Sequence, residues 1–153
     1  MPQTTSFELS KQLYEVAKSK GYELPDSIHY WLNLSDKPVL FQNSIMGNHY
    51  EMWGNMIADT DPINLDDWDL DSDCTYHSYT TDELLAVLPE TITTLNHKKE
   101  NDEFMLSLFK LGDLFGATYE NLYREPRFKV FEDTPSNALC KLFIYLLEND
   151  LMP

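Results

Sequence analysis

The stretch TPSNALCKLFIYLLEN, residues 134–149, decides the fold of this chain. Its first residue, Thr134, can cap the free N–H groups of a helix, and Pro135 suits the first helical turn, where no N–H is needed. The residues that follow would be apolar around most of a helix, interrupted only by Cys140 and Lys141. Such a helix has to be covered by other elements on several sides. We therefore expect it to be the central helix of the core.

An amphipathic helix is expected over residues 5–20. Thr5 and Glu8 have the spacing of a capping box, and Gly21 supplies a stop. One face of this helix is apolar at helical spacing, through Leu9, Leu13, Val16 and Ala17. That face can pack against the C-terminal helix.

A third helix is expected after Thr80 or Thr81, either of which can cap it, and Pro89 ends it. Residues 93–101 are polar and are expected to form an exposed connector or hairpin. The remaining apolar segments are expected to be strands: 28–32, 39–41, 103–111, 114–123 and 127–131. For 28–32, one helical turn is the alternative. Together these elements predict an α+β fold in a single domain over residues 1–153, a small antiparallel sheet of about three to five strands packed with three helices.

The charge is the largest anomaly in the composition. The chain of 153 residues has 26 acidic and 11 basic side chains, a net charge of -15. This field repels phosphates, so we expect no direct contact with nucleic acid, and it attracts a basic surface or cations. Solubility alone is the alternative explanation of the charge.

No apolar run approaches ~18 residues, so no membrane span is expected. The N-terminus has neither a basic start nor an apolar core, so no signal peptide is expected. Cys74 and Cys140 lie far apart and form no disulfide framework. These features predict a cytoplasmic protein.

Residues 59–73 are the most distinctive local segment. They hold seven aspartates and no basic residue, a composition that favours an irregular loop. Trp68 lies among the acids, and Met52 and Trp53 belong to a methionine- and aromatic-rich stretch just before them. That stretch fits either loosely packed core or an adaptable partner surface.

Metal-ligand patterns in this region are incomplete. Asp67, Asp69 and Asp71 match the first three ligands of an EF-hand loop, but Ser72 replaces its glycine and Ser78 its bidentate glutamate. A second candidate pair is Cys74-x-x-His77, which has no partner pair to complete a zinc site. We expect no metal and no cofactor.

No nucleophile motif and no glycine-rich phosphate loop occur, and the chain has only five glycines. We therefore expect no catalytic residues and no enzyme activity.

Four stretches resemble a group of small phage- and prophage-encoded proteins: ELSKQLYE at 8–15, DSIHYW at 26–31, TDELLAVLP at 81–89, and the C-terminal helix from Thr134 to Asn149. The group has no established activity, and the shared residues are structural. The resemblance implies a protein that works in the cytoplasm of a bacterial host.

The leading hypothesis is an anti-defence inhibitor, such as an anti-CRISPR protein. It would bind a host defence protein with a basic surface, such as a CRISPR nuclease, in the manner of a nucleic-acid mimic. The expected contact residues supply charge and buried anchors: Asp66, Asp67, Asp69, Asp71, Asp73, Trp68, Trp53 and Met52.

Two alternatives stay open. The first is a module that binds or sequesters a small nucleotide-like molecule, for which a pocket with Arg124 or Arg127 would be needed. The second is an enzyme that uses carboxylates with a divalent metal.

Overall fold

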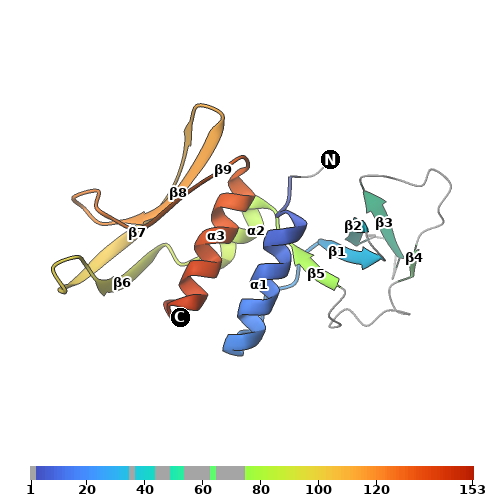
Figure 1. The fold of residues 1–153 in the computed structure, drawn as a ribbon, viewed down its shortest axis with the longest axis horizontal. Coiled ribbons are helices and arrows are strands. Elements are labelled where there is room, and N and C mark those ends of the chain that lie inside the picture. Colours follow the sequence, from blue (N-terminus) through green and yellow to red (C-terminus); the bar gives the residue numbers. More distant parts are fainter. Residues whose placement is uncertain (1–2, 35–36, 44–48, 54–62, 65–74) are drawn as a thin grey trace.

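A computed structural model describes residues 3–34, 37–43, 49–53, 63–64 and 75–153 (Figure 1). Its three helices confirm the predicted number in the described part of the chain: α1 (Phe7–Lys20), α2 (Thr81–Val87) and α3 (Pro135–Glu148). Its strands are β1 (His29–Leu34), β2 (Lys37–Asn43), β3 (His49–Trp53), β4 (Ile63–Asn64), β5 (Thr75–Ser78), β6 (Thr91–Leu95), β7 (Asn101–Leu111), β8 (Leu114–Glu120) and β9 (Pro126–Glu132). The fold is α+β, as expected.

The strands form two antiparallel sheets instead of one. The first has the order β4-β3-β2-β1-β5, and the second has the order β6-β7-β8-β9. Figure 1 shows them at opposite ends of the molecule, with α1 and α3 between them. Strands β1 to β5 precede α2 and pair with one another, whereas β6 to β9 follow α2 and form the second sheet.

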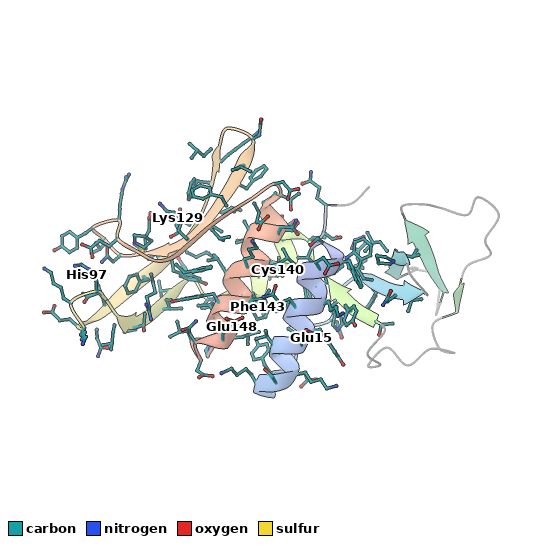
Figure 2. All side chains as sticks on the ribbon, viewed as in Figure 1. Glu15, His97, Lys129, Cys140, Phe143 and Glu148 are labelled. Carbon is teal, nitrogen blue, oxygen red and sulfur yellow. The ribbon has the colours of Figure 1, made fainter. Side chains whose placement is uncertain are left out.

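Helix α3 is the centre of the core, as its composition predicts. It packs against α1, α2, β8 and β9. Thr134 caps it by accepting a hydrogen bond from the Asn137 N–H, and Pro135 follows. Leu139, Cys140 and Phe143 are fully buried, and Figure 2 shows Cys140 and Phe143 within the crowded middle layer.

The cap of α1 differs from the prediction. Ser6, not Thr5, is the N-cap and accepts a hydrogen bond from the Leu9 N–H. Thr5 is instead fully buried and pairs with Tyr79: its N–H donates to the Tyr79 carbonyl (3.0 Å), and its Oγ1 accepts from the Tyr79 N–H (3.1 Å). This tertiary pairing takes Thr5 out of the helix. Gly21 ends α1 at φ 66°, as predicted.

Thr5 also joins α1 to the first sheet. Its carbonyl accepts hydrogen bonds from Trp31 Nε1 and Ser78 Oγ, both 2.8 Å long. Its Oγ1 lies 2.7 Å from Ser10 Oγ. One buried residue thereby connects α1, β1 and β5 through polar contacts.

Helix α2 has the full capping box. Thr80 Oγ1 accepts from the Glu83 N–H, and Glu83 Oε1 accepts from the Thr80 N–H. Leu84 is fully buried, whereas Leu85 is 41% exposed.

The second sheet contains one strand more than expected. Residues 93–95, assigned to a connector, belong to β6, and the turn is confined to the residues that follow. The alternation of Thr91, Ile92 and Thr93 explains this, because Ile92 is buried while the threonines beside it are exposed. No helix in the described part of the chain is long and apolar enough to cross a membrane.

Replacement of Thr5 by valine should lower the free energy of unfolding by about 1–3 kcal/mol, because it leaves the buried Tyr79 N–H without an acceptor. Urea denaturation monitored by circular dichroism measures the loss. Thr4→Val is the matched control, and an equal effect of the two substitutions would contradict the role of the Thr5 hydroxyl.

Candidate functional site

The expected partner-binding residues fall mainly outside the described residues. This holds for Asp66, Asp67, Trp68, Asp69, Asp71 and Asp73. Met52 and Trp53 lie on β3, where they pair with Phe41 and Leu40 of β2. The backbone therefore places these two at the end of the molecule that holds the first sheet (Figure 1), and their role stays a prediction.

Among the described residues, the zinc hypothesis gains no second pair of ligands. Cys74 lies outside the described residues, and His77 is on β5. Within the part of the chain that the structure describes, no three His, Cys, Asp or Glu side chains gather in a way that could hold a metal ion. The EF-hand-like aspartates are not tested by this observation.

His77 belongs to a serine–histidine pair that the sequence did not reveal. Its Nδ1 lies 2.9 Å from the Oγ of Ser27, fifty residues earlier in the chain. The imidazole ring lies near two aromatic rings, with its centroid 5.0 Å from that of Tyr30 and 5.7 Å from that of Tyr79. Only the pairing of β1 with β5 brings these residues together.

The hydrogen bonds of Ser27 decide what this pair can do. Ser27 Oγ is 2.6 Å from the His29 carbonyl oxygen, which can only accept. A hydroxyl has one proton, so Ser27 donates to His29 and must accept from His77 Nδ1–H. His77 therefore does not take a proton from Ser27, as a nucleophilic serine would require. The pair fixes the loop before β1 onto β5.

NMR can check this assignment. In the neutral form of His77, the proton should reside on Nδ1, because Ser27 needs a donor there. Long-range ¹H–¹⁵N correlation spectra above neutral pH distinguish the two tautomers. A bare Nδ1 with a protonated Nε2 would contradict the assignment and restore Ser27 as a candidate nucleophile.

Three other titratable side chains are fully buried in the core: Cys140, Tyr79 and Tyr119. Burial raises the pKa of the Cys140 thiol to about 12. Burial is also the main cause that raises the pKa values of Tyr79 and Tyr119 far above the usual 10.0. The Tyr79 hydroxyl donates to the Pro25 carbonyl, and that of Tyr119 donates to the Pro89 carbonyl, both at 2.6 Å. These groups are structural and are held in their neutral forms.

Their raised pKa values predict a loss of stability at alkaline pH. The folded state keeps its protons longer than the unfolded chain, so this stabilisation is complete below about pH 9 and is lost as the pH rises. Between its unfolded and folded pKa values, each group contributes roughly 1.4 kcal/mol per pH unit. Denaturation at a series of pH values should show a shallower loss for Tyr119→Phe than for the exposed control Tyr123→Phe. Equal slopes would contradict the assignment.

Comparison of the chain with protein-family models, with curated proteins and with solved structures found no match.

The two arginines considered for a nucleotide pocket line different hollows. Arg124 lies with Phe109, Glu120 and Lys129 around an open hollow of about 430 Å³. Arg127 lines a smaller one of about 140 Å³, beside His97, Glu125 and three apolar residues among others. A glutamate side chain also lines each hollow, so neither hollow is lined by basic side chains without an acidic one.

The turn between β8 and β9 is a rigid projection that sequence reasoning missed. Asn121 is buried and holds it: its Oδ1 accepts from the N–H groups of Tyr123 (3.0 Å) and Glu125 (2.9 Å). Its Nδ2 donates to Asp102, a bond that is the main cause lowering the pKa of that carboxyl. Leu122 and Tyr123 are each 84% exposed on this turn. The indication of this turn in the sequence was Asn121, followed directly by the hydrophobic residues Leu122 and Tyr123.

Proposed function

We propose that the protein acts by binding and inhibiting a host defence protein, and that an acidic end of the molecule faces a basic surface of the partner. A polarised charge distribution supports this proposal. From Pro38 to His97 the chain has eleven acidic residues and neither lysine nor arginine. Strands β2 to β5 belong to the sheet at one end of the molecule (Figure 1). Strand β2 begins at Lys37, directly before this stretch, and β6, which lies within it, belongs to the second sheet.

The other end has a different charge. Residues 91–132, which contain the second sheet, have six basic and seven acidic side chains, whereas the rest of the chain has five and nineteen. Such an asymmetry orients the molecule as it approaches a basic partner and raises the rate of association. It is the single observation that carries the proposal.

The chemistry of the described interior agrees with a binding role. The proton of Ser27 is committed to the His29 carbonyl, and the Cys140 thiol is buried. The resemblance to phage-encoded proteins supplies the class of partner, for which a CRISPR nuclease with a groove for nucleic acid is the leading candidate. Carboxylates of this chain would occupy sites that otherwise hold phosphates.

The test compares two variants of equal net charge. Asp66, Asp67, Asp69 and Asp71 are replaced by asparagine in the first. Four exposed acids elsewhere are neutralised in the control: Glu23→Gln, Glu100→Gln, Asp113→Asn and Glu148→Gln. Affinity for purified nucleases of the host is measured by biolayer interferometry at low and high salt.

We expect wild-type affinity to fall steeply with salt, because exposed charges are screened. The aspartate variant should bind about tenfold or more weakly, while the control should stay close to wild type. Equal losses in both variants would show that only net charge matters. Unchanged binding by the aspartate variant would refute the proposed acidic contact surface.

A further inference from the structure

The exposed apolar side chains of the described residues are concentrated on the second sheet. Nine large hydrophobic side chains are exposed in this part of the chain, and seven of them lie between residues 95 and 131. They are Leu95, Met105, Leu111, Leu114, Leu122, Tyr123 and Phe131. A cluster of this kind on a soluble surface marks an interaction site more often than scattered single residues do.

Strand register places five of the seven on one face of the sheet. Met105 pairs with Thr91 on one side and with Glu120 on the other, and residues two apart share its face. This outer face therefore presents Leu95 of β6, Met105 and Leu111 of β7, Leu114 of β8 and Phe131 of β9. The opposite face packs its apolar residues, such as Phe104, into the core with α3.

The outer face has an ordered aromatic cluster at its centre. The rings of Phe109 and Phe131 meet edge to face, with centroids 5.7 Å apart. Phe109 lies directly over Gly116, where an added Cβ would come within 2.3 Å of the ring. Lys129 Nζ lies 5.8 Å from the centroid of the Phe109 ring. The cluster is packed before any partner arrives, which lowers the entropic cost of binding.

The charges on this face are balanced. Glu103 and Glu120 share it with Lys129 by register, and Arg124 borders the hollow above Phe109. A strongly acidic or strongly basic partner would find like charges at half of these positions. In a second copy related by a twofold axis, the acidic residues of one surface can face the basic residues of the other.

We propose that a second copy of this chain binds to the outer face and forms a twofold symmetric, face-to-face dimer. The rest of the chain opposes self-association, because outside residues 91–132 its acidic residues outnumber its basic ones by nineteen to five. Two copies can approach closely at the nearly neutral second sheet without this repulsion. The outer face is both apolar and self-complementary.

The edge of the sheet is a poorer contact. Strand β9 is an edge strand, and Lys129 stands near its middle. Antiparallel pairing of β9 with its own copy would bring like charges together, and lysine on an edge strand opposes such pairing. The contact therefore uses the face and not the β9 edge.

The test is sedimentation velocity of the full chain over a range of concentrations. We expect a monomer–dimer equilibrium that Met105→Lys shifts by about tenfold or more towards monomer. Leu85→Lys is the matched control, because Leu85 of α2 is 41% exposed and Met105 is 40% exposed. Both substitutions lower the net negative charge, so added repulsion between copies cannot explain a loss of dimer.

Leu95→Lys gives a second, independent test at the same face, and it decides the matter if Met105→Lys fails to fold by circular dichroism. A wild-type chain that stays monomeric up to roughly millimolar concentration would overturn the proposal. Equal effects of the Met105 and Leu85 substitutions would overturn it as well.

The dependence on salt concentration distinguishes the proposed dimer contact from binding to a basic partner. The dimer should persist or strengthen as salt rises, because screening relieves repulsion between two chains of charge -15. Binding to a basic partner should weaken under the same conditions. A dimer that dissociates in salt would indicate contact between acidic and basic segments and would refute the apolar face-to-face contact.

Discussion

The burial of α3 is the constraint on which the rest of the structure depends. The helix is apolar around most of its circumference, so α1, α2, β8 and β9 all have to lie against it. Its fully buried residues, among them Leu139, Leu142 and Phe143, provide the common core for elements that are far apart in sequence. The second sheet can cover only one side of α3, which leaves the other face of that sheet exposed.

The first sheet is attached to this core by polar contacts as well as by packing. Thr5 takes part in hydrogen bonds to Tyr79, Ser78 and Trp31, and its backbone leads directly into α1. Such buried polar groups are stable only when their partners are present, so the geometry of this junction is narrowly defined. The Ser27–His77 pair adds a further fixed contact nearby. The Thr5 junction and the Ser27–His77 pair therefore serve the structure of the described interior.

Charge is distributed unevenly along the chain, and in the part that the structure describes the exposed apolar side chains are concentrated on the second sheet. The stretch from Pro38 to His97 is acidic without any lysine or arginine, and most of its strands form the first sheet. The second sheet is nearly neutral and presents Met105 and Phe131 to solvent. The two proposed contacts therefore use different regions and respond to salt in opposite ways. A dimer of this kind would present two acidic ends to its partners.

The α+β class, the three helices and the central position of α3 are predictable from the sequence, because helical periodicity and caps such as Thr134, Thr80 and Gly21 are local signals. The sequence also determines the charge and its uneven distribution. Tertiary contacts, in contrast, draw Thr5 out of its helix to pair with Tyr79 and divide the strands into two sheets. They alone bring Ser27 to His77 and place the exposed residues of four strands on one face. These features depend on strand register and on contacts between distant segments, which side-chain periodicity along a single strand cannot specify.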